Sequence, residues 1–224
     1  FAPVYGKFAN MPVEQVAADP QAQRFGKNLF DTYCIQCHGS DAKGQTGFPN
    51  LTDDDWLWGG SPEQIKQTIA KGRIGIMAPW GPALGEEGVK NAANYVLSLS
   101  GAPHDEERAK RGDAIFHGPP ANCFHGDKGQ GVQGAGPNLT DKVWLWGGSE
   151  RAIVETITNG RHSQMPAWEG FLDDNKIHIL TAYVWGKSHP NGAAKPAAAA
   201  ASAPASAPAA ASAASAAASQ PAGK

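Results

Sequence analysis

"YCIQCHGSDAKG", residues 33–44, contains the most specific pattern in the sequence. Cys34, Cys37 and His38 form a C-x-x-C-H pattern, which is the signature of covalent c-type haem attachment. Two cysteines three positions apart share one helical turn, so each can form a thioether to one haem vinyl group, and the adjacent histidine reaches the iron. A thioredoxin-like redox C-x-x-C would follow a strand in a βαβ unit, and a zinc site would need two more close ligands. The sequence offers neither, so haem attachment is the favoured interpretation.

The sixth ligand of such an iron is predicted to be a methionine. Met paired with His suits electron transfer because the thioether raises the reduction potential. Met77 lies in the Gly/Pro-rich segment "GRIGIMAPWG", and Met165 recurs in the related segment "SQMPAW". A methionine that only fills a gap in the core is the alternative. The loop setting and the repetition favour iron ligation by Met77.

The chain contains a tandem duplication. The segment "PNLTDDDWLWGGSPEQIKQTIAKGR" at residues 49–73 returns as "PNLTDKVWLWGGSERAIVETITNGR" at residues 137–161, 88 positions later. A period this long with two copies indicates two domains of one fold rather than a solenoid. We therefore expect an N-terminal lead at 1–18, domains at 19–101 and 102–189, and a tail at 190–224.

Each repeat is predicted to be helical. Asp19 before Pro20 is a helix start, Ser61 with Gln64 forms a capping box, and Gly72 ends that helix; Ser149 and Gly160 bracket its second copy. No segment shows convincing strand alternation. The expected fold is all-α, with two small domains whose thin cores require a staple such as a bound cofactor.

The second repeat holds an irregular relative of the first motif. In "ANCFHGDKG" (121–129), Cys123 lies two positions before His125, whereas a regular motif has cysteines one and four positions before the histidine. A domain that has lost its haem is one interpretation. A haem anchored by Cys123, with His125 and Met165 as axial ligands, is the favoured one, since the surrounding segment is retained. Either the attachment is irregular, or the sequence lacks two residues between Phe124 and His125.

Composition excludes several classes of function. A formal net charge of −2 provides no basic surface for nucleic acid. No run approaches the ~20 apolar residues of a membrane span. The Ala/Ser/Pro-rich segment from Asn191 has almost nothing to bury and is expected to be a disordered tail.

Together these motifs resemble the dihaem cytochrome c subunit of cbb3-type haem–copper oxidases. The likeness extends from about Val4 to Lys187 and rests on the first motif, "GFPNLTDDDWLWGG", "GEEGVKNAANYV" and the second "SQMPAW" segment. It implies two class I cytochrome c domains in tandem and two c-type haems. The implied residues are Cys34, Cys37, His38 and Met77 for the first haem, and His125 and Met165 as axial ligands for the second. The chain departs from the family pattern at Cys123.

The resemblance also implies a cellular role. Such a subunit takes electrons from a soluble cytochrome c or cupredoxin on the periplasmic side of the bacterial inner membrane. It passes them towards a monohaem cytochrome c subunit and the catalytic haem–copper subunit, and has no catalytic site of its own. Subunits of this kind have an N-terminal membrane anchor, which is missing before Phe1. The alternatives to this role are a free soluble dihaem cytochrome c that shuttles electrons, and a dihaem peroxidase or gas sensor.

Overall fold

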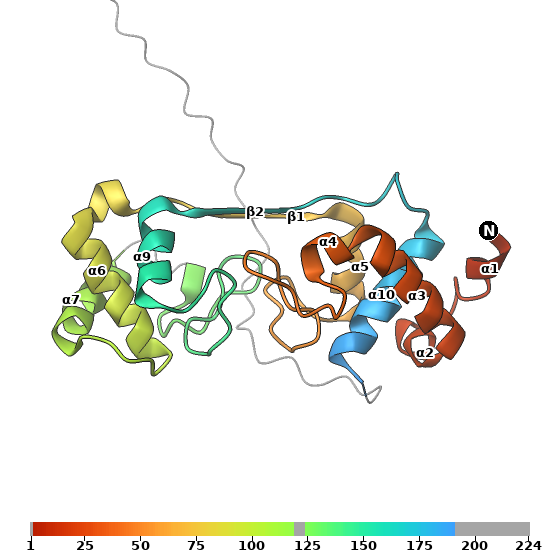
Figure 1. Cartoon of the computed structure of the whole chain (residues 1–224), viewed down its shortest axis with the longest axis horizontal. Coiled ribbons are helices and arrows are strands. Elements are labelled where there is room, and N and C mark those ends of the chain that lie inside the picture. The colour runs from red at the N-terminus through yellow and green to blue at the C-terminus, as the bar shows by residue number, and fades with distance from the viewer. Residues whose placement is uncertain (1, 119–123, 191–224) are drawn as a thin grey trace, which may run out of the picture.

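The structure is a computed structural model that describes residues 2–118 and 124–190. It is mostly helical, which confirms the expected fold class, and two short strands lie among the helices (Figure 1). Cys123 and all but the first residue of the expected tail lie outside the described residues. The elements are α1 (Ala2–Gly6), α2 (Val13–Ala18), α3 (Pro20–Tyr33), α4 (Ile35–His38), α5 (Pro62–Lys71), β1 (Arg73–Met77), α6 (Gly81–Leu99), α7 (Glu106–Phe116), α9 (Glu150–Asn159), β2 (Arg161–Met165) and α10 (Asp174–Ser188).

The predicted helix boundaries are confirmed by their caps. The Asp19 carboxylate accepts hydrogen bonds from the backbone N–H groups of Gln21 and Ala22 at the start of α3. Ser61 and Gln64 form the complete capping box of α5, and at the start of α9 the Ser149 hydroxyl accepts a hydrogen bond from the Ala152 N–H. These side chains satisfy N–H groups that have no partner within the helix.

The strands β1 and β2 form an antiparallel pair in which Gly75 faces Ser163 at the centre. Sequence patterning did not predict them, because the apolar side chains of β1 point outward: Ile74 and Ile76 are 57% and 70% exposed. The pair carries the chain across the middle of the molecule twice (Figure 1).

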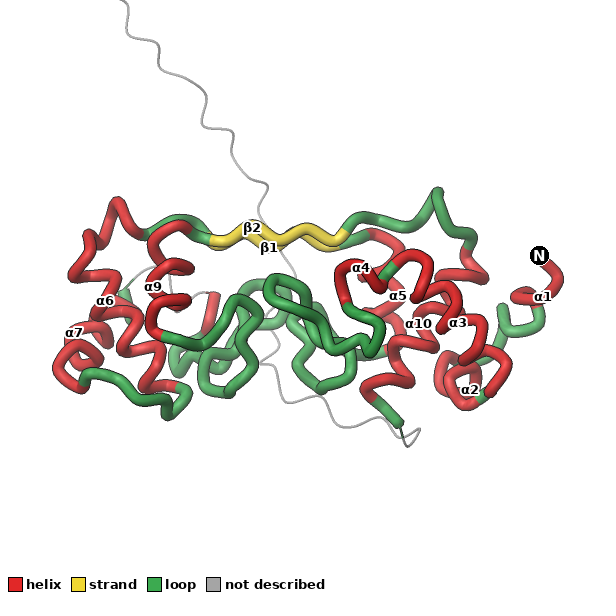
Figure 2. Tube along the Cα trace, in the orientation of Figure 1, coloured by secondary structure: helices red, strands yellow, loops and turns green. Residues whose placement is uncertain are grey.

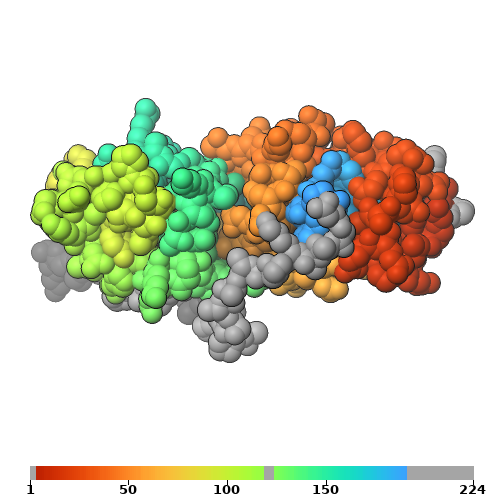
Figure 3. Space-filling model, turned by 90° about the horizontal axis from the view of Figure 1, so that it is seen from below, coloured from red at the N-terminus to blue at the C-terminus, as the bar shows by residue number. Residues whose placement is uncertain are grey.

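The helices pack into two bodies, which do not follow the order of the repeats. The first body consists of α1–α5 together with α10, and the second body consists of α6, α7 and α9. Figure 3 shows α10, in blue, between the red and orange segments of the first body. The expected boundary between the two domains, at residues 101/102, marks where one repeat ends and the next begins, and it stays a prediction. In the structure this point lies in the connection between α6 and α7, which pack on each other within the second body.

The long loops of the two bodies meet beneath the strand pair (Figure 2). The backbone N–H of Gly47 donates to the Leu145 carbonyl at 2.8 Å, and that of Gly134 donates to the Leu57 carbonyl at 2.7 Å. Because the two bonds join corresponding positions of the repeats in opposite directions, the bodies are related by an approximate two-fold axis.

Within residues 2–118 and 124–190, none of the helices combines the length and the apolar character that a membrane crossing requires.

Candidate haem-binding sites

The first motif occupies a short helix placed by the end of α3. Cys34 is the C-cap of α3 and the N-cap of α4, and its carbonyl accepts hydrogen bonds from the N–H groups of Cys37 (3.2 Å) and His38 (2.9 Å). This turn presents both half-buried, unpaired thiols and the histidine from one segment. The structure therefore places both thiols and the histidine within one turn.

The Cys34 thiol has a raised pKa. Burial, and to a smaller extent the neighbouring Cys37, raise its pKa to about 12. Reactive cysteines in C-x-x-C redox motifs have lowered pKa values instead. This difference counts against the thioredoxin-like interpretation of the motif.

His38 is buried and oriented by the backbone. It is 8% exposed, and its Nδ1 lies 3.1 Å from the Pro49 carbonyl oxygen. Nδ1–H donation to this carbonyl leaves the Nε2 lone pair for a metal, the usual outer contact of a histidine ligand. Burial lowers the pKa of His38, while the hydrogen bond to Pro49 partly opposes this effect. The lowered pKa favours the neutral ring, the form that binds a metal.

The second repeat keeps this arrangement despite its irregular motif. The Nδ1 of His125 lies 2.9 Å from the Pro137 carbonyl oxygen, and burial likewise lowers the pKa of His125. Its own carbonyl accepts a hydrogen bond from the N–H of Gly131, which fixes the following loop. The structure gives no geometry for Cys123, which lies outside the described residues.

The two methionines are placed at the ends of the strands, in opposite bodies from those expected. Met165 packs against the core of the first body, as Cys34 and Trp168 also do. Met77 packs against the core of the second body, together with Trp80. The structure does not bring Met77 to His38, the pair expected from the first repeat.

The first body contains one buried donor that is suited to a bound acceptor, the indole N–H of Trp56. The indole Nε1 of Trp56 is buried and has no hydrogen-bond partner among the described residues. Its ring lies against Gly60, where a Cβ would approach Trp56 Cδ1 to 2.7 Å. An N–H in this position needs an acceptor, which a haem propionate would supply. The residues present therefore fit a haem.

The paired arginines are anchored outside the cores. Arg73 donates from Nε to the Thr68 hydroxyl at 3.0 Å and lies over the Trp58 ring. Arg161 makes the equivalent contacts with Thr156 and Trp146. These contacts hold one arginine charge at the start of β1 and one at the start of β2, the strands that end at Met77 and Met165.

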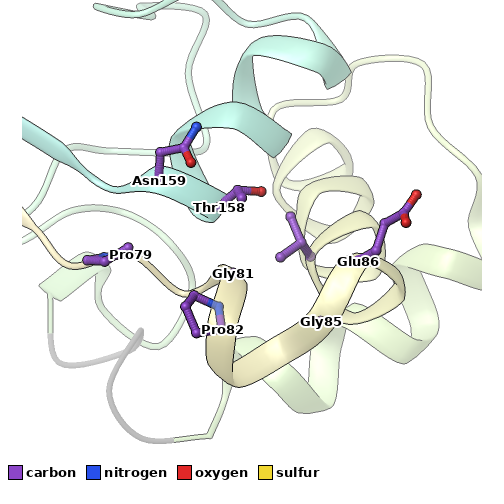
Figure 4. A pocket seen from close by; sticks show the side chains of 8 residues that line it. Pro79, Gly81, Pro82, Gly85, Glu86, Thr158 and Asn159 are labelled. Carbon is purple, nitrogen blue, oxygen red and sulfur yellow. The ribbon is translucent and has the colours of Figure 1, made fainter.

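A cavity of about 530 Å³ opens between the start of α6 and the end of α9 (Figure 4). Its lining contains no histidine, cysteine or methionine, so it offers no iron ligand. It is lined by Pro79, Gly81, Pro82, Gly85, Glu86, Val89, Thr158 and Asn159.

Sequence reasoning missed the carbonyls of Pro49 and Pro137. A signal for them was available, because both prolines open the repeated "PNLT" segment. Sequence reasoning gave no indication that Met77 and Met165 lie in the opposite bodies, since several residues that make the equivalent contacts are of the same type in both repeats, such as Ile69 and Ile157.

Comparison with known proteins gives a consistent result. The family model described as "Cytochrome C oxidase, cbb3-type, subunit III" matches residues 21–96 and again residues 107–184. The chain is 50% identical over 197 residues to "Cbb3-type cytochrome c oxidase subunit CcoP" of Rubrivivax gelatinosus, covering 86% of this chain and 64% of that relative. It is 46% identical to "Cbb3-type cytochrome c oxidase subunit FixP" of Azorhizobium caulinodans, covering 80% and 65% respectively.

The chain thus spans slightly less than two thirds of the length of these relatives. The two matched segments confirm two cytochrome c units in tandem, and such units carry c-type haem. With 154 residues matched by the family model (76 in the first segment and 78 in the second) and close relatives of the same kind, this chain belongs to the family of cbb3-type cytochrome c oxidase subunit III.

Proposed function

We propose that the chain is an electron-transfer subunit that carries two c-type haems. Cys34 and Cys37 attach the first haem and Cys123 attaches the second, with His38 and His125 as histidine ligands. Met77 and Met165 supply one thioether to each iron. The observation that supports both sites most strongly is the repeated histidine–carbonyl contact, at 3.1 Å in one body and 2.9 Å in the other.

The protein's own groups hold the redox centres in place. Neutral imidazoles oriented by the carbonyls of Pro49 and Pro137 bind metal without losing a proton, and buried side chains around them exclude water. Haem iron supplies reversible one-electron oxidation and reduction when bound, and a methionine ligand raises its potential. A donor set of this kind relays electrons and performs no substrate chemistry.

Membership of this family supports a role for the chain in respiratory electron transfer. We propose that the chain accepts electrons from a soluble cytochrome c or cupredoxin on the periplasmic side of the inner membrane. It delivers them towards a monohaem cytochrome c subunit and the oxygen-reducing haem–copper subunit. We expect the chain to co-purify with these membrane subunits. Recovery of the chain without them would favour a free soluble shuttle.

Haem counting tests the proposal. A pyridine haemochrome assay on the purified holoprotein should give two haems per chain, and intact mass should show both attached. One haem per chain would refute the second site. Addition of carbon monoxide to the reduced protein should leave the spectrum unchanged, because both irons have six ligands. A spectral shift would indicate an open iron and favour a peroxidase or a gas sensor.

A further inference from the structure

The ring of His117, the C-cap residue of α7, joins this helix to the loop that follows His125. Its Nδ1 lies 3.0 Å from the backbone carbonyl oxygen of Asp113, one turn earlier, and 3.0 Å from a carboxylate oxygen of the same residue. Its Nε2 lies 2.9 Å from the backbone carbonyl oxygen of Asp127. The contact with Asp127 spans ten positions of sequence, which include both Cys123 and His125. It therefore links the two sides of the irregular motif. We call the contacts with Asp113 and Asp127 the His117 clamp.

Both ring nitrogens of His117 face hydrogen-bond acceptors. A carbonyl or an ionised carboxylate accepts hydrogen bonds and donates none. A neutral imidazole has one N–H and one lone pair, so it can donate to Asp113 or to Asp127 but not to both. The protonated ring donates from both nitrogens and makes both bonds at once. The observed arrangement is thus the one that an imidazolium requires.

The groups around the ring favour this positive charge. The carbonyls of Asp113 and Asp127 raise the pKa of His117 most, the Asp113 carboxylate adds to this effect, and the slight burial of the ring opposes it. From α6, the Tyr95 ring meets the His117 ring edge-on, with the centroids 5.9 Å apart. Burial, and then Asp113, raise the pKa of that phenol, so it stays neutral while His117 titrates. The clamp is therefore complete below the pKa of His117 and loses one bond as the pH rises through it.

The first repeat has a different pair of side chains at the equivalent positions. Lys27 lies three positions before the phenylalanine near the end of α3, and Asp31 lies one position after it; Asp113 and His117 have the same places in α7. Lys27 forms an ion pair with Asp31 Oδ2, and among the described residues Asp31 Oδ1 is buried without a hydrogen-bond partner. The signs of the two charges are thus reversed between the repeats. Only the second repeat uses a histidine here, the side chain whose charge ordinarily changes near neutral pH.

We propose that His117 is a positioning residue for the second haem: in its protonated form it ties the loop that follows His125 to α7, and this makes the second haem site, but not the first, respond to pH near neutrality. The presence of that haem rests on the proposed function. The second motif has one cysteine where the first has two, so its loop has fewer covalent links and depends more on the clamp. A positive charge beside the site stabilises ferrous haem relative to ferric haem, which carries one more positive charge. The reduction potential of the second haem should therefore fall as His117 loses its proton.

The charge of His117 is measured first, in the unmodified holoprotein. NMR resonances of the ring in the reduced, diamagnetic protein, followed against pH, give its pKa. We expect a pKa above about 6.5, the ordinary value for a histidine. A pKa at or below that value would overturn the proposal, because the ring would then be mostly neutral at neutral pH and could make only one of the two bonds.

Hydrogen–deuterium exchange measures the tie between helix and loop. The amides of Gly129 and Gly131 are hydrogen-bonded within the loop, to the carbonyls of Gly126 and His125. The protection of a peptide that covers this loop is compared with its intrinsic exchange rate at each pH. In the wild-type holoprotein this protection should fall as the pH rises through the pKa of His117. Protection that does not change over this range would overturn the proposal.

Three variants separate the charge of His117 from its bulk. His117→Gln is never charged and should show the low protection at every pH, whereas His117→Arg keeps a charge throughout and should show the high protection at every pH. His104→Gln is the matched control: it removes an exposed histidine of the α6–α7 connection whose Nδ1 meets the Ala102 carbonyl, and it should behave as the wild type. Equal protection in the wild type and in His117→Gln at low pH would overturn the proposal.

Reduction potentials distinguish a positioning role from a purely structural one. In potentiometric titrations at several pH values, His117→Gln should remove a fall in potential with rising pH from one of the two haems and leave the other haem unchanged. An unaltered pH dependence of both haems would overturn the proposal. A count of one haem per chain would refute the second haem of the proposed function, while the NMR and exchange measurements would still report on the clamp.

Discussion

Asp55 and Asp141, from the acidic loops of the two repeats, lie close enough for one to act on the ionisation of the other. Burial raises the pKa of Asp55 to about 6, and the charge of Asp141 is the next contribution, followed by Asp53 and Asp54. An acidic group with a raised pKa in the folded protein keeps its proton there after the unfolded chain has lost it. Its ionisation therefore lowers stability as the pH rises from about 4 to about 6.

Asp141→Asn should accordingly stabilise the protein at neutral pH. Removing a repelling charge from a partly exposed group is expected to raise the free energy of unfolding at pH 7.5 by about 0.5 kcal/mol. The gain should vanish near pH 4, where Asp55 is protonated in the folded protein. Denaturant unfolding at both pH values measures it. Asp127→Asn, which removes a carboxylate that does not act on Asp55, is the control. An equal gain at both pH values would contradict the interaction.

The close approach of α3 and α10 predicts a large effect at Gly26. Gly26→Ala places a methyl group 2.4 Å from the Tyr183 Cβ, so the helices must separate. Overpacking of this kind costs about 1–3 kcal/mol, or roughly 2–10 °C in melting temperature for a chain of this size. Thermal unfolding of the holoprotein should show the loss.

Gly75→Ala provides the control for that substitution. An added Cβ there meets only the Ser163 Cβ, at an ordinary 3.9 Å. Equal melting temperatures for the two variants would mean that the contact between Gly26 and Tyr183 is not tight.

These relationships separate what the sequence could predict from what it could not. The ends of helices depend on local side chains, so the starts of α3 and α5 could be predicted from Asp19, Ser61 and Gln64. The His38 motif was equally local. The pairing of helices was not, because Tyr95 and Tyr183 are the same residue type in equivalent positions, and each lies against a glycine, Gly112 and Gly26 respectively. Because the two copies share these residue types, the sequence alone does not show which tyrosine packs against which glycine.

The Cys34 and Cys37 thiols should both be consumed in the mature protein. Their half-buried positions on one turn beside His38 suit two thioethers to one haem. A proteolytic peptide spanning residues 25–43 should carry the mass of haem, and Cys34→Ala with Cys37→Ala should remove it. Free thiols or a disulfide in the wild-type peptide would contradict this prediction. Met11 packs on the first core but is not a proposed ligand, so the Met11→Leu variant should keep the haem and its reduction potential.

The last prediction concerns the irregular motif of the second repeat. His125 already has the backbone contact that orients a ligand, and the motif in the sequence has one cysteine in place of the usual two. Inserting two residues between Phe124 and His125, the second of them Cys, restores C-x-x-C-H while retaining Cys123. If the wild-type haem has a single thioether, the haemochrome α-band of the inserted variant should move to shorter wavelength, because a second vinyl group becomes saturated. The haem count should stay at two. Intact mass of the wild-type protein first establishes whether two residues are missing from the sequence. An inserted variant that rises from one haem to two would show that the wild-type second repeat binds none.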